Sequence, residues 1–139
     1  MILTKEYNVK KNDFVNAGKV SVEVKRLLKE TGISPSTIRR IGIACYEAEI
    51  NMIIHSLGGD ITFNVEDDGK VTLSFDDVGP GIPDIERALV EGFSTASMEA
   101  KEMGFGAGMG LPNIKRVSDE FSISSSSEGT HLLIGFVEQ

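Results

Sequence analysis

The residues best suited to chemistry in this chain are four glycines spaced at every second position. They lie in the run Gly104-Phe105-Gly106-Ala107-Gly108-Met109-Gly110. Glycine lets another group lie directly against the main chain. A helix is expected to follow at 111–119, so bare N–H groups and the positive end of the helix dipole would face an anion. The run predicts a phosphate-binding loop. A flexible linker is the alternative, but linkers are typically rich in serine and lysine rather than in residues such as Phe105 and Met109.

A second group of polar residues interrupts an apolar helix expected over 34–57. Glu47, Asn51 and His55 follow each other at intervals of four and therefore share one side of that helix. Because a buried, unpaired carboxylate is costly, Glu47 needs either a partner or a function, and an internal salt bridge is the structural alternative. Glu49 falls on nearly the opposite side, where we expect it to be solvated. His55 is expected to cap or pack the helix end.

An aspartate ends a strand expected over 70–77. The strand alternates, so Asp77 lies on the same face as its apolar residues, whereas Asp76 lies on the polar face. An inward carboxylate entering the turn 78–82 suits a flat heterocycle that carries an amino group; the alternative is an aspartate that accepts N–H bonds within its own turn. In the last strand, Thr130 begins a face shared with Leu132, Ile134 and Phe136.

Composition limits the kinds of partner. The 139 residues carry a formal net charge of −7, which argues against binding to nucleic acid because that requires a basic face. The sequence contains no apolar run of membrane-spanning length and no secretory signal pattern, so we expect a cytoplasmic protein without a membrane partner. The single cysteine, Cys45, excludes an internal disulfide and is expected to be buried.

The order of the expected elements indicates an α+β fold rather than a doubly wound parallel sheet. We expect one domain over 1–139, a two-layer α/β sandwich in which helices pack on one face of a mostly antiparallel, mixed sheet. The first helix is expected to begin at an Asn12 or Asp13 cap and to end at Gly32, and Gly58-Gly59 to break the second. The other expected elements are strands 2–9, 60–66, 121–126 and 130–137 and a helix over 83–91.

These motifs, taken together and in this order, resemble the GHKL ATPase superfamily. Within it, the chain looks most like the bacterial single-domain serine/threonine kinases that act as anti-sigma factors, or like their switch-kinase relatives. The motifs are Glu47-x-x-x-Asn51, Asp77-x-Gly79-x-Gly81, the loop Gly104 to Gly110, and Gly129-Thr130. The stretches 77–85, 92–95 and 110–116 look especially like the switch-kinase branch.

The resemblance implies the Bergerat ATP-binding fold with ATP and Mg²⁺ as cofactors. It makes Glu47 the general base, Asn51 the Mg²⁺ ligand, and Asp77 the acceptor for the adenine amino group, supported by Thr130. The remaining nucleotide-binding residues that it implies are Gly79, Gly81, Ile82, Gly104, Phe105, Gly106, Ala107, Gly108, Met109, Gly110 and Leu111. The ATP lid would cover about 84–110.

The partner implied by the resemblance is a STAS-domain antagonist protein, phosphorylated on a serine or threonine. A sigma factor, a downstream phosphatase or regulator, and a second copy of the chain are further candidate partners. The alternative is a nucleotide-dependent anti-sigma binding module with little phosphotransfer. Several anti-sigma kinases place an arginine just before the glycine loop, whereas the nearest basic residue here is Lys101. Lys115 and Arg116 could reach phosphates or be solvated.

Overall fold

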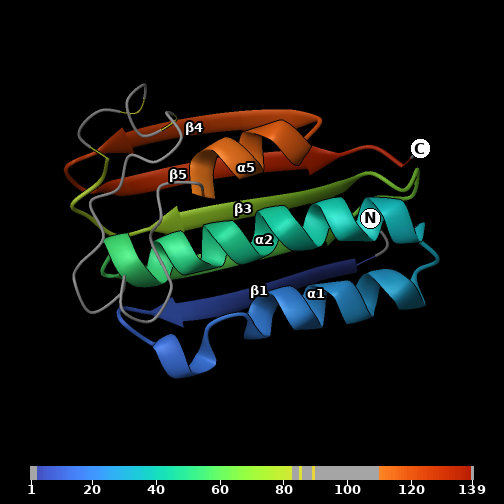
Figure 1. The fold of residues 1–139 in the computed structure, drawn as a ribbon, viewed down its shortest axis with the longest axis horizontal. Helices are drawn as coiled ribbons and strands as arrows, with labels where there is room; N and C mark the ends of the chain where they lie inside the picture. The colour runs from blue at the N-terminus through green and yellow to red at the C-terminus, as the bar shows by residue number, and fades with distance from the viewer. Residues whose placement is uncertain (1–2, 83–84, 86–88, 90–109, 139) are drawn as a thin grey trace.

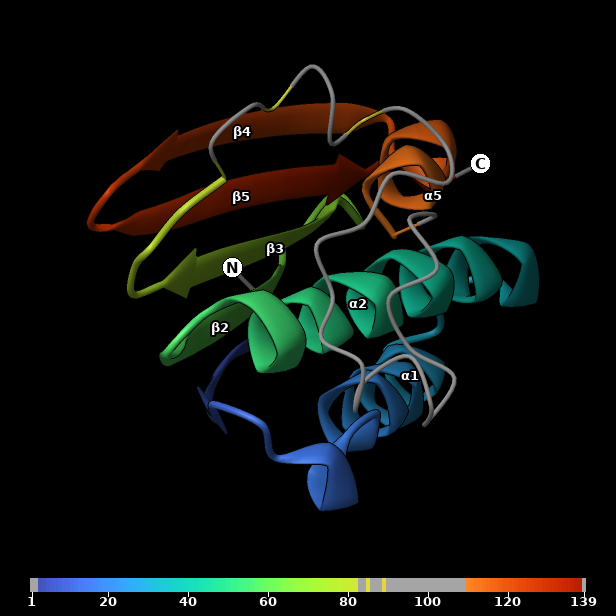
Figure 2. The same ribbon diagram turned by 60° about the vertical axis from the view of Figure 1, so that its left-hand side comes forward.

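Helices cover one face of a five-stranded sheet in the computed structural model, which describes residues 3–82, 85, 89 and 110–138 (Figure 1). Figure 2, turned by 60° from that view, shows the layer of helices beside the sheet. The strands are β1 (Leu3–Lys10), β2 (Gly58–Val65), β3 (Val71–Asp77), β4 (Glu120–Ser126) and β5 (Gly129–Phe136). The helices are α1 (Lys19–Glu30), α2 (Pro35–His55) and α5 (Gly110–Val117), with a 3-10 turn at Phe14–Asn16. The predicted α+β sandwich is confirmed.

The sheet has the order β1-β2-β3-β5-β4, and all four of these neighbouring pairs are antiparallel. The expectation of a mixed sheet is therefore wrong for the described strands. The β2–β3 hairpin turns at 66–70, where the strands expected over 60–66 and 70–77 meet, and β4 and β5 form a second hairpin. Such short connections can join only antiparallel strands.

Helix α2 crosses the centre of the helical layer, with α1 on one side and α5 on the other, and it packs on the sheet (Figure 1). Cys45, on its inner side, is fully buried, as predicted. The alternation predicted for the strands places their apolar residues in the same core: Ile61, Phe63, Val65, Val71, Leu73, Phe75, Leu132, Ile134 and Phe136. No helix within the described ranges is both long enough and apolar enough to cross a membrane.

The helix starts differ in how well they were predicted. Helix α2 begins where it was expected, and Ser34 caps it, because its hydroxyl oxygen accepts the backbone N–H of Thr37 at 3.4 Å. Helix α1 begins only at Lys19, since the chain first makes the 3-10 turn, and Asp13 instead accepts a bond from the side chain of Asn16. Gly58 and its neighbour start strand β2 rather than forming a separate break. The helix expected over 83–91 falls largely outside the described residues.

The expectation that Glu49 is solvated is wrong. Its side chain is buried, and its carboxylate accepts the backbone N–H groups of Gly18, Val20 and Ser21 at 3.1, 3.3 and 3.2 Å. These are among the N–H groups that the first turn of a helix leaves without internal partners. The face of α2 that carries Glu49 is covered by α1, so periodicity alone could not tell it from a solvent face. Burial raises the pKa of Glu49, and the three N–H donors oppose that rise.

Candidate functional site

A row of polar side chains replaces the apolar rows at the end of the sheet where β3 ends and β5 begins. Asp77 lies there beside Thr130, and its Oδ1 accepts the Thr130 backbone N–H at 2.8 Å. Ser125 of β4 is paired with Thr130 on the other side. The next inward row consists of Phe75, Leu132 and Ile123. Asp77 thus meets the edge of the core, and it accepts its bond from another strand rather than from its own turn.

The Asp77 carboxylate is only half satisfied. Within the described part of the chain, no group donates a hydrogen bond to its Oδ2. Burial raises the pKa of Asp77, while the Thr130 N–H and the nearby His131 act in the opposite direction. Asp76 points to the other side of the sheet and contacts His131 at 2.8 Å, as strand alternation requires. One acceptor oxygen at this edge is therefore available to a ligand.

The segment after β3 passes directly over the turn that joins β4 to β5. Gly81 has a φ of +83°, and a Cβ placed there would lie 2.0 Å from the carbonyl oxygen of Ser126, so only glycine fits. A Cβ at Gly79 would also collide with a carbonyl of this turn. This close approach lets the backbone N–H of Ile82 donate to the Ser125 hydroxyl at 2.6 Å. The structure thus places Gly79, Gly81 and Ile82 beside the Asp77–Thr130 pair.

Glu47 and Asn51 lie one turn apart on α2, and both are half-buried. Among the described residues, neither the carboxylate nor the amide has a hydrogen-bond or ion-pair partner. An internal salt bridge for Glu47 is thereby excluded within that part of the chain. Burial raises the pKa of the Glu47 carboxyl, because no group in the described part of the chain compensates the ionised form. Burial likewise lowers the pKa of His55 at the end of the same helix.

The start of α5 lies against Asn51. A Cβ on Gly110 would be 3.0 Å from the Asn51 Oδ1 and 3.1 Å from its Nδ2. The last glycine of the glycine run therefore meets the asparagine motif, at a helix end whose first N–H groups lack internal partners. The Leu111 side chain packs in the core, so only its backbone faces this region. Residues Gly104 to Met109 lie outside the described part of the chain.

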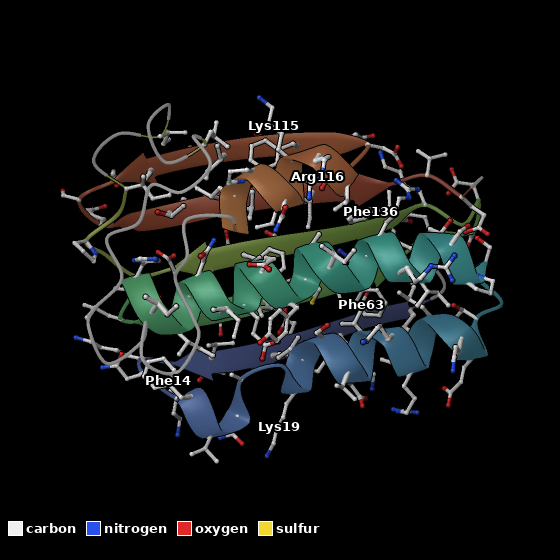
Figure 3. The ribbon with its side chains drawn as sticks, viewed as in Figure 1. Phe14, Lys19, Phe63, Lys115, Arg116 and Phe136 are labelled. Carbon is white, nitrogen blue, oxygen red and sulfur yellow. The ribbon has the colours of Figure 1, made fainter. Side chains whose placement is uncertain are left out.

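The two halves of the site meet at one end of the molecule (Figure 1). Met52, which follows Asn51, reaches to 2.9 Å from the position that a Cβ on Gly59 would occupy, and Gly59 is paired with Asp77. Lys115 and Arg116 are exposed on α5 (Figure 3), and Arg116 bonds to the side chain of Asn113. The described residues include no cluster of three His, Cys, Asp or Glu side chains able to hold a metal ion.

Comparison with known proteins identifies the family. Residues 12–136 match the histidine kinase-like ATPase domain. The chain belongs to this family. A curated relative, the serine/threonine-protein kinase RsbT of Bacillus subtilis (strain 168), is 38% identical over 112 residues, which are 78% of this chain and 78% of RsbT. The resemblance inferred from the motifs is confirmed, and the relative is named for the enzyme class that the sequence predicts.

Two solved structures share the fold of this chain. The RsbU and RsbW domains of Rv1364c from Mycobacterium tuberculosis superpose with a TM-score of 0.64 at 19% identity, covering 96% of this chain and 32% of that one. The SiaB–SiaC complex from Pseudomonas aeruginosa gives a TM-score of 0.59 at 17% identity, covering 97% and 88%. At these identities the comparison supports the architecture alone.

Sequence reasoning missed Ser125 as a site residue. The signal was present in the alternation of β4, where Phe121 and Ile123 face inward and Ser125 continues their face. The run of serines around Ser125 obscured this signal, because the sequence alone does not show which serines of the run face inward. Only its pairing with Thr130 distinguishes it.

Proposed function

We propose that this protein is an ATP-dependent serine/threonine protein kinase of a bacterial partner-switching circuit. Its substrate would be a serine or threonine of a STAS-type antagonist protein. One observation carries the proposal: three half-buried polar groups, those of Glu47, Asn51 and Asp77, have unused bonding capacity among the described residues at one end of the fold. Unpaired buried polar groups are costly, so a ligand is their natural partner. The kinase name of RsbT supports the same conclusion.

Adenine would lie at the end of the sheet. The Asp77 Oδ2 would accept a bond from the exocyclic amino group, while Oδ1 keeps its bond to the Thr130 N–H. Gly79, Gly81 and Ile82, held against the β4–β5 turn, would form the wall along the base. The raised pKa of Asp77 reflects a carboxylate that gains from a donor, because burial has removed part of its solvation.

The triphosphate would lie between α2 and the start of α5. The loop Gly104 to Gly110 and the Leu111 N–H would surround the phosphates, and the helix dipole favours the negative charge. Asn51 fits as the protein ligand of Mg²⁺, because its amide faces the start of α5 and has no partner among the described residues, and Mg²⁺ keeps water and phosphate oxygens as its other ligands. The cation would neutralise phosphate charge during transfer.

Glu47 would act as the general base. The acceptor hydroxyl of the partner gives its proton to the Glu47 carboxylate as its oxygen bonds to the γ-phosphorus, and the bond to the β-phosphate oxygen breaks to release ADP. The raised pKa of Glu47 strengthens it as a base, because burial leaves the carboxylate poorly solvated. Most of the remaining catalysis would come from positioning and charge neutralisation.

The wider setting is part of the same proposal. One domain would span 1–139, with the ATP lid at about 84–110, most of which lies outside the described residues. The protein would work in the cytoplasm as an anti-sigma regulatory factor or switch kinase of transcription. A sigma factor, a downstream phosphatase and a second copy of the chain are its further candidate partners.

The test is phosphorylation of purified STAS-domain proteins in the presence of Mg-ATP, followed by intact-mass measurement. A mass increase of one phosphoryl group on the acceptor, absent with ADP and absent with the Glu47→Gln variant, is the expected result. Tight ATP binding without transfer to any acceptor would instead support the nucleotide-dependent binding module. Absence of ATP binding would overturn both.

A further inference from the structure

Ser125 lies in a chain of hydrogen bonds that ends at Thr130. The backbone N–H of Ile82 donates to the Ser125 Oγ at 2.6 Å, and the Ser125 Oγ lies 2.8 Å from the Thr130 Oγ1. The only other described acceptor near this hydroxyl is the Gly129 carbonyl, at 3.5 Å. The three groups come from the segment after β3, from β4 and from β5, so the chain crosses the edge at which Asp77 lies.

The first bond of this chain has a fixed direction. A backbone N–H can only donate, so Ser125 must accept from Ile82 and has a single proton to pass on. Thr130 Oγ1, at 2.8 Å, is at the ideal O–H···O distance, whereas the carbonyl at 3.5 Å is beyond the usual range. By distance, Thr130 is therefore the better acceptor for the Ser125 proton. Linked bonds of this kind also strengthen one another.

Thr130 is then left with its own proton to donate. The site thus presents an acceptor, the Asp77 Oδ2, next to a donor, the Thr130 hydroxyl, on the same inward row of the sheet. The edge of adenine presents an amino donor next to the N1 acceptor, which is the complementary order. The edge of guanine presents a carbonyl acceptor next to an N–H donor. Its carbonyl would face the Asp77 acceptor, and its N–H would face the Thr130 donor.

We propose that Ser125 is a positioning residue that makes the site select adenine over guanine by fixing the direction of the Thr130 hydroxyl. This inference rests on the proposed nucleotide site. It assigns Ser125 no contact with the base. Were the Ser125 proton directed to the Gly129 carbonyl instead, Thr130 would have to donate to Ser125 and would turn a lone pair toward the base nitrogen. That arrangement would weaken adenine binding rather than support it.

The test pairs variants of the protein with variants of the ligand. Calorimetry in Mg²⁺ would measure dissociation constants for ATP, for GTP and for deaza-ATP, the analogue with C–H in place of ring nitrogen N1. We expect Ser125→Ala to weaken ATP binding about five- to tenfold, the loss of roughly one hydrogen bond, and to leave deaza-ATP binding within about twofold. The preference for ATP over GTP should fall by a similar factor. Ser125→Thr, which keeps the hydroxyl, should restore the wild-type pattern.

Two controls separate this role from a structural one. Ser124 is the neighbouring serine on the exposed face of β4, and Ser124→Ala should leave all three dissociation constants unchanged. Thr130→Val should lose the same N1-dependent affinity, and adding Ser125→Ala to it should cost nothing further.

Equal weakening of ATP and deaza-ATP binding in Ser125→Ala, or an unchanged ratio of ATP to GTP affinity, overturns the inference while leaving the kinase proposal intact. A wild-type protein that binds none of the three nucleotides refutes the proposed function itself. If Ser125→Ala does not fold, the inference is tested on the wild-type protein alone. Binding of deaza-ATP as tight as that of ATP would then contradict a hydrogen-bond donor at Thr130.

Discussion

The Glu49 Oε2 accepts the backbone N–H of Gly18 at 3.1 Å, so a residue in the middle of α2 caps the start of α1. The same carboxylate also accepts the N–H groups of Val20 and Ser21. A negative charge at a helix N-terminus is favourable, and here it is also buried. This contact fixes α1 against the helix that carries Glu47 and Asn51.

Replacing this cap should destabilise the fold strongly. Glu49→Gln keeps the shape but removes the charge and one acceptor oxygen, leaving buried N–H donors without a partner. We expect the free energy of unfolding to fall by about 2–4 kcal/mol, measured by urea denaturation. Glu30→Gln is the matched control, since Glu30 is exposed and, among the described residues, pairs with Arg26 alone, and it should change stability by less than about 0.5 kcal/mol. Equal effects of the two substitutions would contradict the capping role.

The second prediction concerns Glu47→Gln, which should greatly slow phosphotransfer and stabilise the protein. Loss of a general base should reduce the rate of phosphotransfer on the order of a hundredfold or more, with the affinity for ATP retained. Burial raises the pKa of Glu47 above its usual 4.5, so the native state binds this proton more tightly than the unfolded chain does. The ionised carboxylate therefore costs stability at neutral pH, and Glu47→Gln should melt at a higher temperature than the wild type.

The same linkage predicts how that difference depends on pH. Below the ordinary pKa of 4.5 the carboxyl is protonated in both states, so the advantage of Glu47→Gln should vanish there and grow as the pH rises through the native pKa. Thermal melts from acid to neutral pH would measure it. Undiminished phosphotransfer by the variant would remove Glu47 as the base, and a stability difference that is largest in acid would contradict its burial as the cause.

The third prediction compares the two adjacent aspartates of β3. Asp77→Asn keeps an oxygen that can accept the Thr130 N–H, so the fold should persist, but an amide replaces the oxygen offered to adenine. Loss of a charged acceptor should weaken ATP binding about ten- to a hundredfold, as measured by calorimetry. Asp76→Asn is the control, because Asp76 faces the other side of the sheet and contacts Ser74 and His131. Similar ATP affinity in both variants would refute the assignment of Asp77.

How much of this could be predicted from sequence depends on how local each signal is. Strand alternation alone predicted the inward face of Asp77 and Thr130, because the side-chain period within a strand is fixed. Helical periodicity placed Glu47 beside Asn51 for the same reason. The same reasoning wrongly predicted that Glu49 is solvated, since whether a helix face meets solvent or α1 depends on tertiary packing. The position of Ser125 at the site could not be predicted either, because it follows from strand pairing with Thr130 rather than from the neighbours of Ser125 in the chain.

The last prediction tests the contact between Asn51 and the start of α5. Gly110→Ala would place a methyl group 3.0 Å from the Asn51 Oδ1, so the amide must move by a few tenths of an ångström. Alanine favours a helix more than glycine does, so the melting temperature should hold or rise. ATP binding in Mg²⁺ should nevertheless weaken about five- to tenfold, while binding in EDTA stays within about twofold, because only the metal ligand has moved. Asn51→Ala should abolish the difference between the two conditions, and adding Gly110→Ala to it should change nothing more, since the residue being displaced is gone. Equal weakening of ATP binding with and without Mg²⁺ would mean that Gly110 matters to the phosphates themselves rather than to Asn51.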